Sequence, residues 1–394
     1  MKKLLVVIFS ISTMIHSQTA VCQNNAVPLE ISTSYLDSFI VGEMKESGIV
    51  GLGAAVIVDK EIVWMEGYGY ADRKNKVPFT PSTIMNIGSI SKTITGASLM
   101  HAVEEGLVSL DEDINSYLPF EVSNPFFPDE KITLRNLATH TSGITDRYEV
   151  YDSTYCFGGD TPEPLADFLR NYFVPKGKYY SKDNFLNYKP GAYRDYSNIA
   201  AGLAGYIIET VAGESLNEYS KRHIFTPLKM NDTGWFLSEI ELENHSKLYG
   251  KQDGTINPIP LYELTTYPDG GVRTSVSSLT KFFISLIDGG KFNGVSILTE
   301  KSVKEMLRFQ YTRSNKPENI NLEEPNKNAG IFWSTKRDVT RIGHGGSDLG
   351  LRTEMFCDLK KEVGVILFIN TERSTKVIYD ELWKYGQTLR DTKR

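Results

Sequence analysis

The sequence predicts an α/β (α+β) protein in which the N- and C-terminal parts share one antiparallel sheet flanked by helices. Runs rich in β-branched and aromatic residues occur before residue 70 and again beyond Gly330. Between them, from about residue 120 to 262, helical patterns alternate with long loops. Strands that pair across such an insertion form one sheet, and the insertion forms a mainly helical subdomain on it. We expect the sheet part at about 23–119 and 263–394 and the helical part at about 120–262.

Local patterns predict the individual elements. Residues 51–58 and 62–69 are predicted as strands because they are rich in β-branched and aromatic residues, with Asp59-Lys60 as the turn. Residues 89–105 are predicted as a helix because apolar residues recur at helical spacing and Gly106 follows as a stop. The other predicted helices are 199–211, 215–225, 275–286 and 375–389, and the other strands are 331–334, 339–342, 352–357 and 363–369.

The first residues predict export. Lys2 and Lys3 precede an apolar run over residues 4–15, and small and polar residues follow it. This order is typical of a secretory signal peptide, and the run is shorter than the ~20 residues that a membrane span needs. We expect a signal peptide over residues 1–22 and a mature protein in the periplasm or secreted. Lipidation of Cys22, which would tether the protein to a membrane, is the alternative.

Composition excludes several classes of function. The net charge is −6 and Lys and Arg are scattered, so the basic stripe of a nucleic-acid-binding protein is missing. No second apolar run is long enough to span a membrane. No Cys/His cluster has the spacing of metal ligands, so we predict no metal and no cofactor. Cys156 and Cys357 could pair in an oxidising compartment, or lie apart as small buried hydrophobes.

The first candidate site is Ser89-Ile90-Ser91-Lys92, at the start of the predicted helix 89–105. Residues three apart share a helix face, so Ser89 and Lys92 can lie within hydrogen-bond distance. A serine hydroxyl needs a neighbour to take its proton, and burial would weaken the preference of a lysine for its charged form. The helix N-terminus also favours an anion at the serine oxygen. A capping serine beside a solvated lysine is the alternative.

The second candidate is Tyr196-Ser197-Asn198. Tyr196 can carry a proton if a nearby ammonium lowers its pKa, and Asn198 can donate a hydrogen bond to a substrate carbonyl. A half-buried core tyrosine and a helix-capping asparagine are the alternatives.

The third candidate is Gly343-His344-Gly345-Gly346-Ser347, which we expect at the edge of a strand. Glycines there allow a substrate backbone to approach closely. A backbone N–H from this edge could complete an oxyanion hole with the N–H of Ser89. A plain glycine-rich turn is the alternative.

The order S-x-x-K, Y-x-N, H-x-G resembles the serine β-lactamase and penicillin-binding protein superfamily. The likeness is greatest to its class C β-lactamase-like branch, which includes D-alanyl-D-alanine carboxypeptidases and family VIII esterases. It extends over nearly all of the mature chain, through residues 137–143, 190–191, 224–230 and 268–271. The resemblance implies a β-lactamase/transpeptidase-like fold and an acyl-enzyme mechanism without metal or organic cofactor. The implied catalytic residues are Ser89 as nucleophile, with Lys92 and Tyr196 as its proton network; spacing leaves open which of the two takes the proton. The implied substrate-binding residues are Asn198, His344, Gly346 and Ser347.

One departure from that family concerns the third motif. β-Lactamases of this branch carry K-T-G there, whereas this chain has His344-Gly345-Gly346, and histidine is mostly neutral near pH 7. We therefore predict a hydrolase that cleaves an ester or a peptide-like amide of a small-molecule, peptide or cell-wall-type substrate without gripping a free carboxylate. Arg273 or Arg352 could replace the missing charge. The alternatives are a D-alanyl-D-alanine carboxypeptidase or β-lactamase and, from another class, a catalytically inactive ligand-binding protein.

Overall fold

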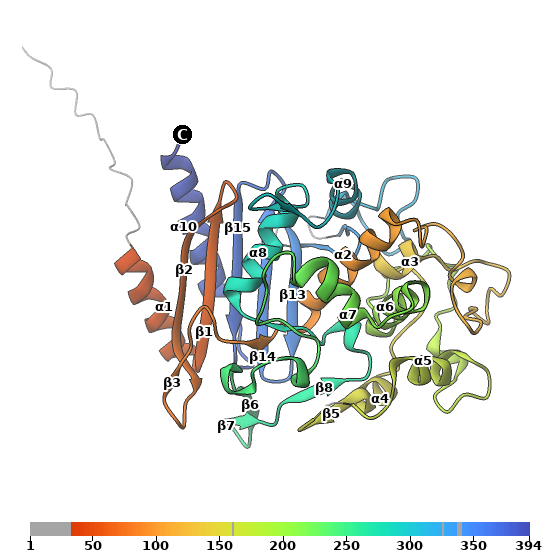
Figure 1. Ribbon diagram of the computed structural model, residues 1–394, viewed down its shortest axis with the longest axis horizontal. Helices are drawn as coiled ribbons and strands as arrows, with labels where there is room; N and C mark the ends of the chain where they lie inside the picture. The colour runs from red at the N-terminus through yellow and green to blue at the C-terminus, as the bar shows by residue number, and fades with distance from the viewer. Residues whose placement is uncertain (1–32, 160, 325–326, 337–340) are drawn as a thin grey trace, which may run out of the picture.

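A computed structural model describes residues 33–159, 161–324, 327–336 and 341–394; the predicted signal peptide and Cys22 lie outside them. A seven-stranded sheet runs through the molecule in the order β12-β13-β14-β15-β1-β2-β3 (Figure 1). All its neighbouring strands are antiparallel, which confirms the predicted fold class. The strands are β1 (Gly51–Val58), β2 (Glu61–Asp72), β3 (Val77–Pro78), β12 (Ser334–Lys336), β13 (Arg341–Asp348), β14 (Leu351–Asp358) and β15 (Val363–Ile369).

The pairing of β1 with β15 joins the two ends of the chain. Leu52 lies opposite Ile369, and the register continues to Val58 opposite Val363. Every residue of β1 is buried, because both faces of the sheet are covered. Helices α1 (Thr33–Ser47) and α10 (Lys376–Thr392) cover one face, and α8 (Val276–Ile287) packs on the other (Figure 1).

Helix α2 (Ser91–Glu104) lies between the sheet and the remaining helices (Figure 1). It packs against α6 and α7, and most of its side chains are buried. Its threonines are buried with their hydroxyls satisfied; for example, Thr95 donates to the carbonyl of Pro268 at 2.7 Å. The other helices are α3 (Leu134–Ala138), α4 (Tyr148–Tyr151), α5 (Leu165–Phe173), α6 (Asn198–Ala212), α7 (Leu216–Ser220), a π-helix (Lys221–Phe225) and α9 (Glu300–Leu307).

Most predicted elements lie within a few residues of the observed ones, with one clear exception. The strand predicted over 331–334 begins only at Ser334. The backbone before it hydrogen-bonds to two helices instead: the N–H of Ile331 donates to the carbonyl of Met306 and that of Phe332 to the carbonyl of Ala138. The strand predicted over 339–342 falls partly outside the described residues, and β13 extends through the third motif.

Two further predictions concern membrane-spanning helices and a possible disulfide. Among the described residues, no helix combines the length and the apolar character that crossing a membrane requires. No disulfide joins Cys156, on β5 (Tyr155–Phe157), to Cys357 on β14.

The backbone of β13 touches the turn that precedes α2. A Cβ on Gly346 would lie 2.2 Å from the carbonyl oxygen of Ile87 and 2.2 Å from Oγ1 of Thr353. The Thr353 hydroxyl in turn donates to the Ile87 carbonyl at 2.8 Å. On the other side of the contact, Gly88 has a φ of +54°, a conformation that side chains disfavour. Both glycines are therefore needed for the sheet to approach Ser89.

We predict that Gly346→Ala displaces the turn at Ile87 and lowers both stability and activity. Overpacking of this kind costs about 1–3 kcal/mol. The matched control is Gly345→Ala, because the atoms nearest to a Cβ there are the Glu354 carboxylate at 3.3 Å, the Thr353 carbonyl at 3.4 Å and the Lys336 ammonium at 3.8 Å, all farther than the 2.2 Å at Gly346. Denaturant unfolding and ester turnover measure the two effects. Equal stability and equal ester turnover of the two variants would contradict the close contact at Gly346.

Candidate active site

Ser89 and Lys92 lie together at the start of α2. Ser89 is half-buried in a single 3₁₀ turn (Gly88–Ile90) that leads directly into the helix. The Lys92 ammonium is fully buried and lies 3.2 Å from the Ser89 Oγ. It also donates to the Asn198 Oδ1 at 2.7 Å and to the Asp269 carbonyl at 2.8 Å. These three acceptors fix the ammonium in one position beside the serine.

The pKa of Lys92 is set by two opposing influences. Burial does act to lower its pKa, as expected. The electrostatic influence of Tyr196, Asp269 and Asp146 acts in the opposite direction and prevails, so the pKa of Lys92 is raised. This direction favours the ammonium form of Lys92, which donates the three hydrogen bonds described above.

Tyr196 lies over this ammonium. The Lys92 Nζ is 5.0 Å from the centroid of the Tyr196 ring. The ring of His140 packs against Tyr196 with centroids 4.3 Å apart, and that of His344 lies at 6.2 Å. The His140 Nδ1 accepts the backbone N–H of Ser197 at 3.2 Å. Burial, together with the charges of Arg194 and Lys92, holds the pKa of His140 well below its usual range. The His140 ring is therefore neutral; it packs against Tyr196 and accepts the N–H of the following residue, Ser197.

Asp146 positions the second motif, a role that the sequence did not indicate. Its carboxylate accepts the Ser197 hydroxyl at 2.6 Å and the backbone N–H groups of Asn198 and Ile199 at 2.8 and 3.1 Å. Ser197 itself caps α6, accepting from the N–H of Ala200 at 3.0 Å. Asn198 is therefore not the cap; its amide oxygen binds Lys92, which leaves its NH₂ group for another partner.

A buried carboxylate lies behind Lys92. Asp269 Oδ1 is 3.8 Å from the ammonium, and both side chains are almost completely buried. The Tyr151 hydroxyl donates to the same oxygen at 3.0 Å. Burial raises the pKa of Asp269 to about 6, while the charge of Lys92 and the hydrogen bond from Tyr151 oppose the rise. The stretch 268–271 was visible in the sequence as a family-like loop, but nothing marked its aspartate as a partner of Lys92.

The third motif brings a neutral side chain to the site. Burial, reinforced by the nearby charge of Lys92, lowers the pKa of His344 to about 3. A side chain at Gly345 would point toward Glu354 and Lys336, away from the contact that Gly346 makes with Ile87. The backbone nitrogen of Ser347 lies beside Gly88, 3.4 Å from where a Cβ on that glycine would be. The Ser347 N–H is thus next to the turn that carries Ser89.

The two arginines considered as replacement charges are engaged elsewhere. Arg273 is buried, donating to the carbonyls of Trp235 and Gly271 at 2.8 and 2.6 Å. Arg352 donates to the carbonyls of Asp348 and Leu351. Three other cations, Lys92, Lys336 and Arg194, each lower the pKa of His344; Lys336 pairs with Glu354, and Arg194 also lowers the pKa of His140. The only sequence signal of Arg194 is its place two residues before Tyr196.

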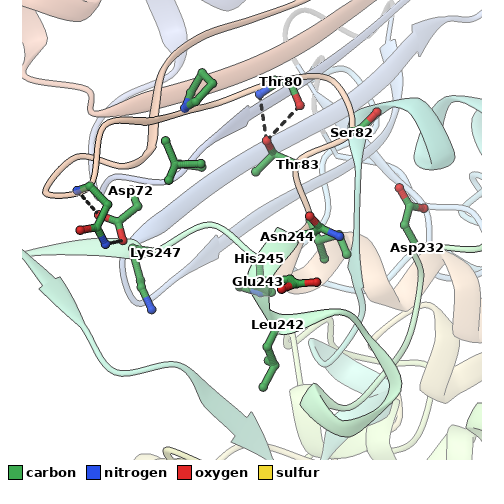
Figure 2. Close-up of a pocket in the computed structure, with 15 residues that line it drawn as sticks. Asp72, Thr80, Ser82, Thr83, Asp232, Leu242, Glu243, Asn244, His245 and Lys247 are labelled. Carbon is green, nitrogen blue, oxygen red and sulfur yellow. Dashed lines mark hydrogen bonds between the residues drawn. The ribbon is translucent and has the colours of Figure 1, made fainter.

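A separate polar pocket of about 650 Å³ opens on another part of the molecule (Figure 2). Asp72 and Lys247 lie at one end and Asp232 and Ser82 at the other, and none of the three motifs contributes to its lining. The pocket is therefore distinct from the candidate active site.

Residues 36–384 match the Beta-lactamase family. The chain belongs to this family of serine hydrolases. PbpX of Bacillus subtilis (strain 168), a protein named for penicillin binding, is 30% identical over 281 residues. The match covers 71% of this chain and 63% of PbpX, so the chain spans less than two thirds of that relative.

Solved structures of this superfamily share the fold. The octameric penicillin-binding protein homologue from Pyrococcus abyssi has a TM-score of 0.72 and 26% identity, covering 91% of this chain and 77% of that one. The D-amino acid amidase from Ochrobactrum anthropi SV3 has a TM-score of 0.69 and 22% identity, covering 92% and 99%. The resemblance inferred from the three motifs is thus confirmed at the level of the superfamily.

We predict that Asp269→Asn lowers the pKa of Lys92. The substitution removes a negative charge that favours the buried ammonium, so the ammonium deprotonates at lower pH. The measurement is the pH dependence of the rate at which a fluorophosphonate labels Ser89. The limb that reports deprotonation of Lys92 should move to lower pH in the variant; a limb that stays in place, or moves to higher pH, would show that Asp269 does not act on Lys92.

Proposed function

We propose that the protein is an exported serine hydrolase that forms an acyl-enzyme on Ser89 and cleaves an ester or a peptide-like amide bond. One observation carries the proposal: a fully buried ammonium lies 3.2 Å from the Ser89 hydroxyl at the start of a helix. Membership of a serine hydrolase family supports the reaction class, and the pattern of residues 1–22 supports export.

The proposed acylation step uses Tyr196 as the proton acceptor. The raised pKa of Lys92 favours an ammonium, which leaves the Tyr196 oxygen as the group of the pair that exchanges the proton. As Ser89 Oγ attacks the substrate carbonyl carbon, its proton passes to this network. The N–H groups of Ser89 and Ser347 stabilise the resulting oxyanion. The proton then moves to the leaving alcohol or amine as its bond breaks, and water later releases the acyl group by the same path.

The neutral third motif supports an uncharged substrate group at this position. With its pKa lowered to about 3, His344 is an imidazole throughout the physiological range. Its Nδ1–H donates to the Gly345 carbonyl at 2.7 Å, so its Nε2 can accept a hydrogen bond from an amide N–H or a hydroxyl, but it offers no charge to a carboxylate. An ester, or an amide without a free carboxylate, therefore fits this position better than a β-lactam or a C-terminal D-alanine.

Arg194 supports a second candidate. Its charge reaches His344, so an anionic substrate could pair with this guanidinium in place of the missing lysine. That arrangement would favour a D-alanyl-D-alanine carboxypeptidase or a β-lactamase. The third possibility, an inactive binding protein, lacks support, because Ser89, Lys92 and Tyr196 are all present and close together.

We predict that Ser89→Ala abolishes turnover while the protein remains folded. Loss of the nucleophile of such a unit costs on the order of 10⁴–10⁶ in kcat. Mass spectrometry should place a fluorophosphonate adduct on Ser89 in the wild type and on no residue of the variant. Ser91→Ala is the control, although its hydroxyl also holds the Gly88 carbonyl at 2.7 Å. An unlabelled wild type, or an adduct on Ser91, would reject the proposed nucleophile.

We also predict that kcat/KM is higher for short-chain p-nitrophenyl esters than for nitrocefin or D-alanyl-D-alanine peptides. A charge-assisted hydrogen bond contributes roughly 1.5–3 kcal/mol, which is about ten- to a hundred-fold in affinity, and His344 cannot supply it. If Arg194 does not bind substrate, Arg194→Gln should leave kcat/KM for the esters unchanged. The matched control is Arg313→Gln, on an exposed arginine. A wild type that prefers nitrocefin, with a loss specific to Arg194→Gln, would favour the second candidate.

A further inference from the structure

Two histidines and a glutamate meet at the far end of α2. His101 and Glu105 are four residues apart and therefore share a helix face. His223 belongs to the π-helix (Lys221–Phe225) that packs against this end of α2. One nitrogen of each histidine and one oxygen of Glu105 all lie within 4.8 Å of one another. The sequence predicted no metal, because histidines this far apart in the chain have no recognisable spacing.

Neighbouring groups hold the three side chains in place. The rings of His101 and His223 lie with centroids 4.0 Å apart. The Tyr219 hydroxyl is 2.9 Å from the Nδ1 of His101 and donates to the Glu105 carboxylate at 2.9 Å. An outer hydrogen bond of this kind orients a carboxylate ligand. The side chain of His101 is 18% exposed and that of Glu105 41%, so an ion can reach both.

We propose that His101, Glu105 and His223 bind a divalent transition-metal ion of the Zn²⁺ type. Imidazole nitrogens and a carboxylate are ligands that Zn²⁺ accepts, with bonds of about 2.0–2.2 Å. A tetrahedral arrangement at that bond length places the ligand atoms about 3.4 Å apart. Side-chain rotations that move the ligand atoms by about 1 Å would bring them to that spacing. Water would complete the coordination. The C-terminus of α2 adds a field that favours a cation.

Arg222 competes with the ion. Its Nε donates to the Nε2 of His223 at 3.0 Å, and a positive charge there opposes a second cation. The Arg222 side chain is 60% exposed and also pairs with Glu214, so it can move away from His223 without leaving a buried charge. Metal binding therefore exchanges the contact of Arg222 with His223 for a metal–nitrogen bond.

The proposed ion would join two elements and would not take part in hydrolysis. His101 follows Ser89 by twelve residues, which is about 18 Å along a helix. An ion bound there would join the end of α2 to the π-helix and stabilise α2, the helix that carries Lys92. This proposal is independent of the proposed hydrolase function, since neither histidine nor Glu105 belongs to the catalytic cluster.

The test is a titration of the untagged, metal-free full chain with Zn²⁺ by calorimetry and with Co²⁺ by absorption. We expect one site, with Zn²⁺ raising the melting temperature. The double variant His101→Asn, His223→Asn should weaken binding at least roughly ten-fold and lose the thermal shift. The matched control is Glu218→Gln, on an exposed carboxylate of α7 outside the cluster, which should bind as the wild type does. Ester turnover of the metal-free variants should equal that of the wild type and shows that they are folded.

Two further variants decide the matter if the double variant fails to fold. Glu105→Gln should weaken Zn²⁺ binding, whereas Arg222→Gln should tighten it by removing the competing charge. Equal affinity of the wild type and the double variant would place the ion elsewhere and overturn the proposal. A wild type without a Zn²⁺-dependent thermal shift, or weaker binding by Arg222→Gln, would also count against it.

Discussion

A fully buried ammonium is the constraint on which the candidate site depends. Moving Lys92 out of water is unfavourable unless the fold supplies acceptors and negative charge at its position. Three segments do so: the turn with Ser89, the start of α6 with Asn198, and the loop with Asp269. These segments come from distant parts of the chain, so the ammonium joins the sheet side of the molecule to its helical part. The same three contacts thus hold the ammonium beside Ser89 and satisfy its buried charge.

The same charge explains the second layer of the site. Asp146 and Asp269 both favour the ammonium, and each is itself held by hydrogen bonds, from Ser197 and Tyr151 respectively. A carboxylate that accepts several hydrogen bonds can stay ionised in a buried position. Their elevated pKa values, which burial causes, show that this compensation is incomplete. The site therefore contains a balanced group of charges, and removal of one member changes the protonation of the others.

Local sequence patterns predicted the parts of the site that lie close together in the chain. Ser89 and Lys92 follow from helical spacing, and the strands follow from β-branched runs with clear turns. Asp269, Asp146 and Arg194 could not be recognised, because their roles depend on contacts between segments that only the fold brings together. The sequence left open whether Lys92 or Tyr196 takes the proton, since the charge of Lys92 depends on the sum of burial and three neighbouring groups. Ile331 and Phe332 read as strand residues because they are apolar, but they bond to helices.

The neutral residue at the third motif is consistent with this balance of charge. Lys92 already lowers the pKa of His344, which shows that the two positions interact electrostatically. A lysine at position 344 would place a second ammonium in the field of the first, and like charges in a buried site each favour the neutral form of the other. A neutral imidazole leaves Lys92 as the buried cation beside Ser89. The neutrality of position 344, on which the proposed preference for an uncharged substrate rests, and retention of the ammonium at Lys92 are therefore coupled through one electrostatic interaction.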